Sequence, residues 1–397
     1  MNGKSAVLLV IDGLGVGCLP DAAQYEDTGT STLSHATENG KLSLPYLTKF
    51  GLYKFCGRNG PSQASTGRMV PKSSGKSTVE GHWEMMGQPK TNPFNVFPDG
   101  FSSEIMDTIS KLIGRGLLGG QPASGTKIIE QLGERHQKTG MPIIYTSADS
   151  VLQVAAHENT IPANELYEIC KTIRNNFNQP DSFARIIARP FAREPGNYYR
   201  TSRRRDFTLK IPEPNVLSEL KKRNINISGV GRIADLFPEY LDTFDNPPGN
   251  IECLERTKMY RQMYHGFVFA NLEDLDMLYG HRRDKQGYAK SLAELDEAWP
   301  KFLMSLANDD LLIVASDHGC DPTHEKHTDH TREYTMLMCY MKGYEGVDLG
   351  TRQSLCDVGA TILDFFGINP SCGESVLKDV TSCKKKTKTS TNFYNNN

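Results

Sequence analysis

The sequence lacks the features that mark membrane, disulfide-rich and nucleic-acid-binding proteins. No apolar run reaches the roughly 20 residues that span a bilayer, and the run near the N-terminus is too short for a secretory signal. The nine cysteines form no CxxC pair in a chain of 397 residues, which indicates reduced thiols. The formal net charge of −2 gives no overall attraction to nucleic acid. We therefore expect a cytoplasmic protein with neither a nucleic-acid nor a membrane partner.

Four short apolar runs each end in polar or acidic residues. They cover residues 6–11, 142–145, 266–270 and 311–315. Because the runs are continuous rather than alternating, they predict parallel strands that are buried on both faces of a sheet. Helical patterns lie between them, as at residues 164–175 and 291–306, so we expect an α/β fold. Sites in such sheets form beyond the carboxyl ends of the strands, where three of these runs deliver acidic residues.

The stretch from about residue 91 to residue 212 is richer in arginine and interrupts this pattern. It contains scattered arginines at positions 185, 189, 193 and 200 and the run Arg203–Arg205. In a near-neutral chain, a run of this length favours a face that binds small anions over one that binds nucleic acid. We predict a core domain from residues 1–92 and 213–383, an inserted α+β cap domain at 93–212, and a disordered polar tail at 384–397.

Aspartate and histidine residues follow three of the apolar runs. Carboxylate oxygens and imidazole nitrogens together suit Mn²⁺, Zn²⁺ or iron and fit Ca²⁺ poorly. A single Asp-His pair would more often be a helix cap beside a buried histidine, but three such strand ends make that interpretation improbable. The set predicts two metal ions about 4 Å apart beside one reacting oxygen. Its members are Asp12, Asp276, His281, Asp317, His318 and His330.

Two hydroxyl side chains precede a helical pattern in GKSTVEGHWEMMG, at residues 75–87. Gly-Lys-Ser-Thr resembles part of a phosphate-binding loop, but Val70 stands where that loop requires glycine. A helix N-terminus favours an incoming phosphoryl anion, and a metal ion activates a nearby hydroxyl as a nucleophile. The residues alone leave open whether Ser77 or Thr78 is that nucleophile or only a helix cap.

Two further patterns fall short of known motifs. The glycines of Gly13-Leu14-Gly15-Val16-Gly17 are spaced one position too closely for a dinucleotide-binding loop. His324-Glu325-Lys326-His327 reads H-E-x-H, one residue short of the zinc motif H-E-x-x-H. The two histidines therefore lack the spacing of that motif, and we set them aside as metal ligands.

Together the motifs resemble those of the phosphopentomutases of the alkaline phosphatase superfamily. The resemblance covers nearly the whole chain and is carried by PDA at Pro20, TGTxTLxH ending at His35, GKxTxxGHWEMMG, YTSADSVLQVAAHE at Tyr145, GHRRD at Gly280 and TDHTREY. It implies an alkaline-phosphatase-like core with a mostly parallel central sheet flanked by helices. It also implies interconversion of ribose 1-phosphate and ribose 5-phosphate, and of the deoxyribose pair.

The resemblance further implies how this chemistry is carried out. It implies two Mn²⁺ ions, with Zn²⁺, Co²⁺ or Mg²⁺ as substitutes, and a bisphosphorylated sugar as activator. By motif position Thr78 carries the phosphoryl group, and the six aspartates and histidines above are the metal ligands. Asp329 is expected to orient His330 rather than to touch metal. The residues that match the family's sugar-phosphate positions are Ser147, Asp149, Val151, Arg185, Ile187 and Arg200.

Alternatives stay open at this stage. The same site would be a phosphomonoesterase if water reached a phosphothreonine, or a mutase for another phosphosugar. A phosphosugar-binding protein without activity is disfavoured, because all six ligands and Thr78 are present. The chain departs from the family at Ser77, Glu80, Arg232 and His327, which leaves substrate preference open. We expect a monomer or a weak homo-oligomer.

Overall fold

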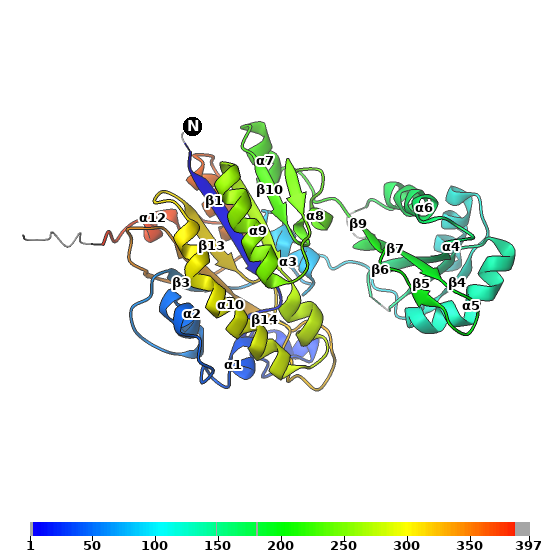
Figure 1. Ribbon diagram of the computed structural model, residues 1–397, viewed down its shortest axis with the longest axis horizontal. Coiled ribbons are helices and arrows are strands. Elements are labelled where there is room, and N and C mark those ends of the chain that lie inside the picture. The colour runs from blue at the N-terminus through cyan, green and yellow to red at the C-terminus, as the bar shows by residue number, and fades with distance from the viewer. Residues whose placement is uncertain (1–2, 148, 180–181, 386–397) are drawn as a thin grey trace, which may run out of the picture. The chain divides into compact units, whose positions relative to one another are not determined.

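The computed structural model describes residues 3–147, 149–179 and 182–385, which form two compact units (Figure 1). The first unit contains the described residues up to 90, Pro212–Ala234, and those from 238 onward. The second contains the described residues of Thr91–Ile211 together with Asp235–Phe237. Of the predicted tail, only Lys384 and Lys385 are described, and the backbone N–H of Lys385 donates to the carbonyl of Gly343 at 2.8 Å. Residues 386–397 lie outside the described residues.

The first unit is built on a nine-stranded sheet. Its strands are β1 (Ser5–Ile11), β2 (Gly15–Cys18), β3 (Ser65–Met69), β10 (Ile227–Val230), β11 (Thr243–Asp245), β12 (Gly266–Leu272), β13 (Leu311–Ala315), β14 (Glu333–Tyr340) and β15 (Asp348–Arg352). They lie in the order β11-β10-β12-β1-β13-β14-β3-β15, with β2 paired to β14. From β11 to β13 all neighbours are parallel, and β14 runs against each of its neighbours.

Helices cover both faces of this sheet. They are η1 (Ala22–Tyr25), α1 (Thr32–Ala36), α2 (Pro45–Phe50), η2 (Leu52–Cys56), α3 (Thr78–Met85), α7 (Val216–Lys222), α8 (Ile233–Leu236), α9 (Asn250–Met263), η3 (Leu275–Gly280), α10 (Lys285–Ser305), α11 (Cys356–Phe365) and α12 (Leu377–Val380). Helices α9 and α10 pack on one face, whereas α3 and α7 both contact α11 on the other. None of the helices in the described ranges has the length and apolar character to cross a membrane.

Strand β1 shows why the apolar runs are continuous. Val7 and Leu9 pack in the same buried cluster as Trp299 of α10, while Leu8 and Val10 point to the opposite face and are equally buried. A strand covered on both faces has no solvent-facing positions, so its sequence does not alternate. The predicted mostly parallel sheet flanked by helices is thereby confirmed.

The second unit is a six-stranded sheet with helices of its own. Its elements are α4 (Ser103–Ile113), β4 (Leu118–Pro122), α5 (Gly125–Thr139), β5 (Ile143–Thr146), β6 (Val151–His157), α6 (Ala163–Asn176), β7 (Arg185–Ala192), β8 (Tyr199–Arg200) and β9 (Arg205–Thr208). Strands follow the order β4-β5-β6-β7-β8, with β9 paired to β7. Helices α4 and α6 cover one face, and α5 covers part of the other. The apolar run at residues 142–145 therefore belongs to a different sheet from the other three.

Candidate active site

The ends of β12, β1 and β13 meet at one edge of the first sheet. These three strands are adjacent and in register, with Val10 of β1 opposite Asn271 of β12 and Ala315 of β13. Asp12 follows β1 directly, and its backbone N–H donates to the carbonyl of Leu272 at 3.1 Å. Parallel pairing therefore brings residues that are far apart in the sequence to the same edge.

One group of possible metal ligands consists of Asp12, Asp317 and His318. All three side chains are buried, and their ligand atoms lie within 4.8 Å of one another. Nε2 of His318 lies 3.4 Å from Oδ1 of Asp12 and 3.2 Å from Oδ2 of Asp317. The hydroxyl of Thr78 lies 3.2 Å from the same nitrogen. This group therefore places a hydroxyl directly beside a carboxylate and imidazole donor set.

The remaining predicted ligands form an adjoining group. Nε2 of His281 lies 3.3 Å from Oδ2 of Asp276, and Nε2 of His330 lies 3.5 Å from Oδ1 of the same carboxylate. Asp276 and His281 are brought together by η3, a short π-helix that follows β12; such turns recur at functional sites. The rings of His318 and His330 stack with centroids 3.8 Å apart, which joins this group to the first. Cys320, which the sequence did not single out, also lies within reach of Asp276 and His281.

Each aspartate of this site has one buried oxygen without a hydrogen-bond partner among the described residues. These atoms are Oδ1 of Asp12, Oδ1 of Asp276 and Oδ2 of Asp317. Buried polar atoms are normally hydrogen-bonded, so unpartnered carboxylate oxygens at one place indicate a missing cationic partner. The carboxylate, imidazole and hydroxyl groups thus fit divalent metal ions.

The pKa shifts of these side chains also favour a bound divalent cation. Burial, followed by the charges of Asp317 and Asp276, raises the pKa of Asp12 well above its ordinary value. Burial also lowers the pKa of His318 to about 4, so this imidazole is neutral at pH 7. Burial would lower the pKa of His281 as well, but the hydrogen bond with Asp276 instead raises it to about 9. A neutral His318 cannot offset the charge of Asp12 and Asp317 beside it, whereas a divalent cation would favour the ionised carboxylates.

The structure separates the roles of Ser77 and Thr78. Ser77 is the N-cap of α3 and forms a capping box with Glu80. Its hydroxyl donates to Oε2 of Glu80 at 2.7 Å and accepts from the Glu80 backbone N–H at 3.4 Å. Two of the departures from the family pattern, Ser77 and Glu80, therefore occur in one capping box. Thr78 is the first helical residue, and its hydroxyl faces His318 instead.

Close backbone packing holds α3 against the end of β13. A Cβ atom at Gly81 would lie 2.5 Å from the backbone oxygen of Asp317, so a larger residue would push the helix away. Gly13 adopts φ +74°, and its backbone N–H donates to Oδ1 of Asp317 at 3.2 Å. These glycines fix the position of Asp317 relative to Thr78.

Two supporting side chains were not identified from the sequence. The amide of Asn271 donates to Oδ2 of Asp12 at 2.8 Å. Nδ1 of His82 lies 2.9 Å from the carbonyl oxygen of Thr78 and 3.3 Å from Oδ2 of Asp317. Asn271 lies within a strand, where its sequence position gives no sign of a role. His82 lies one helical turn after Thr78, and this spacing could have indicated that the two residues share a face of α3. Asp329, expected to orient His330, accepts from the His330 backbone N–H at 2.8 Å.

The second unit carries a polar face formed by Gln153, Arg185, Arg189 and Arg200. These positions share one face of the sheet, because Gln153 pairs with Ile187 and Phe191 pairs with Arg200. Nε of Arg189 donates to Oε1 of Gln153 at 3.1 Å, and burial lowers the pKa of Arg189 to about 10. Nε of Arg200 is buried without a hydrogen-bond partner in the described part of the chain. An anion would provide that partner.

The other predicted substrate-binding residues lie near this face. Ser147 accepts a hydrogen bond from Nε2 of Gln153 at 2.9 Å. Oδ1 of Asp149 accepts from the backbone N–H of Val151 at 3.0 Å, and burial raises the pKa of Asp149. Val151 and Ile187 lie on the same sheet face as Arg185, and Arg185 approaches Asp206 at 3.4 Å. The six positions thus lie on or beside one face of this sheet.

The arginine run adjoins this face, because Arg204 shares the carboxylate of Asp206 with Arg185. Arg204 makes two contacts of 2.7 Å with the carboxylate of Asp206. Arg203 pairs with Glu158 at 3.4 Å, and Arg205 lies over the ring of Tyr167. Each of these three side chains has a partner within its own unit, so the run contributes ion pairs and ring contacts there.

Comparisons with known proteins agree with this fold and site. A family model described as the Metalloenzyme superfamily matches residues 4–370. A phosphopentomutase from Caldanaerobacter subterraneus subsp. tengcongensis is 44% identical over 389 residues, covering 95% of this chain and 98% of the relative. A phosphopentomutase from Dictyoglomus turgidum is 45% identical over 387 residues, with 95% and 98% covered. A solved structure from Pyrococcus horikoshii has a TM-score of 0.50 at 13% identity and covers 94% of this chain and 99% of its own, which supports the fold alone.

The fold and the family model define the class first: a metalloenzyme built on a mostly parallel sheet that helices cover on both faces. The full-length relatives define the family, and this chain belongs to the phosphopentomutases, enzymes of the isomerase class that transfer a phosphoryl group. Family membership and the candidate ligand groups together indicate divalent metal ions.

Proposed function

We propose that the enzyme interconverts ribose 1-phosphate and ribose 5-phosphate, and the corresponding deoxyribose phosphates. The proposal rests on one observation above all. The hydroxyl of Thr78 lies 3.2 Å from His318, beside three buried aspartates that each have an unpartnered oxygen. The names of its relatives support the pentose phosphate substrate.

Asp12, Asp317 and His318 would hold one divalent cation, and Asp276, His281 and His330 a second. We propose Mn²⁺ for both, with Zn²⁺, Co²⁺ or Mg²⁺ able to substitute. When bound, such cations neutralise the charge of a phosphoryl group and lower the pKa of a nearby hydroxyl. Gly13 and Asn271 orient Asp317 and Asp12 through the hydrogen bonds described above.

Thr78 would carry the phosphoryl group between the two ends of the sugar. Its Oγ gives up its proton and forms a bond to phosphorus as the bond between phosphorus and a sugar oxygen breaks, and that oxygen takes up a proton. The phosphothreonine then passes its phosphoryl group to the free hydroxyl of a pentose monophosphate. The resulting bisphosphorylated sugar returns its other phosphoryl group to Thr78, so a bisphosphate would also serve as activator. The N-terminus of α3 favours the anionic group during each transfer.

The polar face of the second unit would bind the phosphate that does not react. Arg185 and Arg200 supply planar guanidinium groups, which suit bidentate contact with phosphate. Ser147, Asp149, Val151 and Ile187 would shape the surroundings of the sugar. The nine cysteines are all free, in keeping with the reducing cytoplasm in which we place the enzyme.

The test is an assay of purified enzyme with Mn²⁺, ribose 5-phosphate and a bisphosphorylated sugar. The proposal predicts ribose 1-phosphate as the product. Absence of this product with metal bound would contradict it. Release of inorganic phosphate faster than isomerisation would instead indicate a phosphomonoesterase, and isomerisation of hexose phosphates alone would indicate a different sugar mutase.

A further inference from the structure

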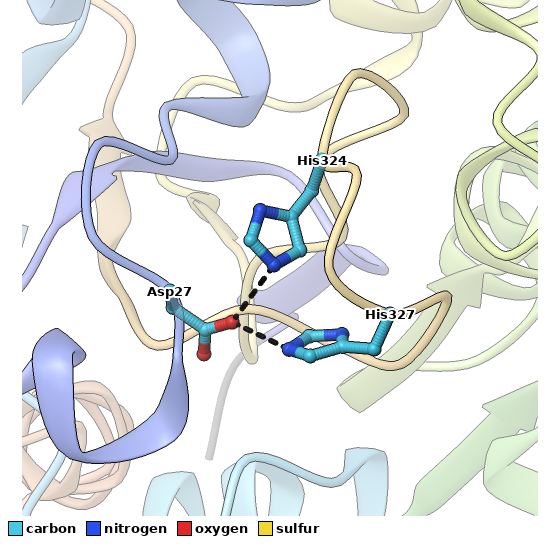
Figure 2. A group of neighbouring side chains, drawn as sticks. All are labelled: Asp27, His324 and His327. Carbon is cyan, nitrogen blue, oxygen red and sulfur yellow. Dashed lines mark ion pairs between the residues drawn. The ribbon is translucent and has the colours of Figure 1, made fainter.

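A cluster of possible metal ligands lies outside the candidate active site in the first unit. It consists of Asp27, His324 and His327 and is called here the Asp27 cluster (Figure 2). Oδ1 of Asp27 lies 2.8 Å from Nε2 of His327 and 3.6 Å from Nε2 of His324. The two histidines belong to the H-E-x-H segment that was set aside because its spacing does not match the helical zinc motif. The segment is not helical in the structure, and its turns direct both imidazoles at the same carboxylate.

The carboxylate of Asp27 is held in a fixed orientation. The side chain is fully buried, and its Oδ2 accepts hydrogen bonds from Nζ of Lys76 at 2.9 Å and from the backbone N–H of Arg332 at 2.8 Å. Nε2 of His327 lies 2.8 Å from its Oδ1, but this contact lacks hydrogen-bond geometry, so Oδ1 has no hydrogen-bond partner among the described residues. Because Oδ2 is occupied by two donors, Oδ1 is left facing the imidazoles. A buried acceptor without a partner is destabilising unless another group is present to satisfy it.

The histidines provide matching donors for a cation. Nε2 of His324 is also buried and has no hydrogen-bond partner in the described ranges. The side chain of His327 is 24% exposed, so one side of the cluster is open to solvent. An ion could enter from that side and keep water as its remaining ligands.

Hydrogen bonding within the protein satisfies only part of this cluster. Nδ1 of His327 accepts from the backbone N–H of Asp329 at 3.2 Å, which assigns the ring proton to Nε2, beside Asp27. Nζ of Lys76 lies 3.4 Å from that same Nε2. Neither contact reaches His324. A cation would satisfy Asp27 and His324 together, with the His327 proton moving to Nδ1 in place of the long hydrogen bond.

We propose that Asp27, His324 and His327 bind a divalent transition-metal ion such as Zn²⁺ or Co²⁺. Two imidazoles and a carboxylate suit these ions better than Mg²⁺ or Ca²⁺. Ligand bonds of about 2.1 Å in tetrahedral geometry place ligand atoms about 3.4 Å apart. The separation of 3.6 Å between Asp27 and His324 meets this requirement, and His327 would move back by about 0.6 Å.

The position of the cluster suggests that the ion has a structural role. Asp27 already contacts Lys76, two residues before Thr78. His327 lies three residues before His330, a proposed ligand of the active-site ions. A bound ion would therefore fix the segment that leads to His330 against the segment that leads to Thr78. This site goes beyond the proposed mutase reaction and does not depend on it.

The experiment counts metal ions in the full-length enzyme after dialysis against Zn²⁺. We expect His327→Gln to hold one ion fewer per chain than the unchanged enzyme, and to be stabilised less by Zn²⁺ in thermal unfolding. His265→Ala is the control, because His265 is exposed and belongs to neither cluster; it should lose no ion. An equal ion count in His327→Gln and the unchanged enzyme would overturn the proposal. The difference of one ion is informative even if the mutase reaction is not observed.

A second measurement needs no variant and so does not depend on folding of a mutant. Crystals of the unchanged enzyme soaked in Zn²⁺ should give an anomalous scattering peak bounded by Oδ1 of Asp27 and Nε2 of His324 and His327. Absence of a peak there, with peaks present at the active site, would overturn the proposal.

Discussion

The carboxyl ends of β12, β1 and β13 carry buried aspartates, whereas the polar face of the second unit carries arginines and a glutamine. The first site concentrates negative charge, and three of its carboxylate oxygens lack a hydrogen-bond partner among the residues that the structure describes. The second concentrates positive charge, and Nε of Arg200 has no hydrogen-bond partner within the described part of the chain. In the proposed reaction the two sites would have different tasks: cations at the first would activate the reacting phosphoryl group, and arginines at the second would bind a phosphate that does not react.

The two sites also differ in how the chain builds them. At the first, the functional side chains lie outside the strands, in turns or at helix ends: Asp12 and Asp317 follow β1 and β13, whereas Thr78 begins α3. At the second, the side chains alternate along the strands themselves, and α5 covers only part of that face. Side chains beyond strand ends can be repositioned by their turns, whereas those within strands are fixed by the sheet register.

The largest effect should come from removing the proposed nucleophile. Thr78→Ala is expected to lower kcat by about 10⁴-fold or more, because no other hydroxyl faces His318 among the contacts described. Thr78→Ser keeps the hydroxyl and should retain much of the activity. Both variants should bind metal ions as the unchanged enzyme does. If Thr78→Ala isomerises pentose phosphates at the normal rate, the first site has been assigned the wrong role.

The next effect concerns the cation site. Asp12→Asn replaces a buried carboxylate by a neutral amide and should lower activity by about 10³-fold, with loss of one active-site ion. Metal analysis and steady-state kinetics of the same preparation provide the measurement. Asp309→Asn is the control, because Asp309 is exposed and lies outside the candidate ligand groups; it should keep both ions. Full ion content in Asp12→Asn would argue against Asp12 as a ligand.

A smaller effect is expected in the second unit. Arg200→Ala should raise KM by about 10-fold to 100-fold while kcat changes less, because a charged hydrogen bond contributes about 1.5–3 kcal/mol. Arg193→Ala, which removes an arginine stacked on Tyr199, should change KM by about twofold or less. Equal effects of the two variants would show that the polar face does not recognise phosphate.

The smallest effect on activity is expected for Ser77, and it distinguishes a helix-capping residue from the nucleophile. Ser77→Ala should lower the free energy of unfolding by about 1 kcal/mol through loss of the capping box. Ser102→Ala removes the N-cap of α4 in the second unit and should have a similar effect in denaturant unfolding. Activity of Ser77→Ala should fall less than tenfold. A loss as large as that of Thr78→Ala would make Ser77 the better candidate for the nucleophile.

The parts of this structure that follow from local patterns could be predicted. Continuous apolar runs gave β1, β12 and β13, and adjacent parallel strands necessarily bring Asp12 and Asp317 to one edge. The choice between Ser77 and Thr78 could not be made from residue types, because both have a hydroxyl and they differ only in their position on the first turn. The position of His82, one helical turn after Thr78, follows from spacing, but its approach to Asp317 depends on how α3 packs against the sheet.

The Asp27 cluster shows a further limit of sequence reasoning. The H-E-x-H segment was compared with a helical motif, for which its spacing is wrong. Its histidines meet through an irregular loop, and their carboxylate partner lies 297 positions earlier than His324 in the sequence. Pairing of that kind is determined by tertiary structure, so spacing rules alone do not find it.

The central claim is that Thr78 carries the phosphoryl group, and the most direct test is to locate that group on the protein. Enzyme loaded with Mn²⁺ and incubated with a bisphosphorylated pentose should yield, after rapid quenching and proteolysis, one phosphorylated peptide with the modification on Thr78 by tandem mass spectrometry. The same label should disappear when excess pentose monophosphate is added. Phosphorylation of another residue, or active isomerisation with Thr78 never modified, would contradict the account.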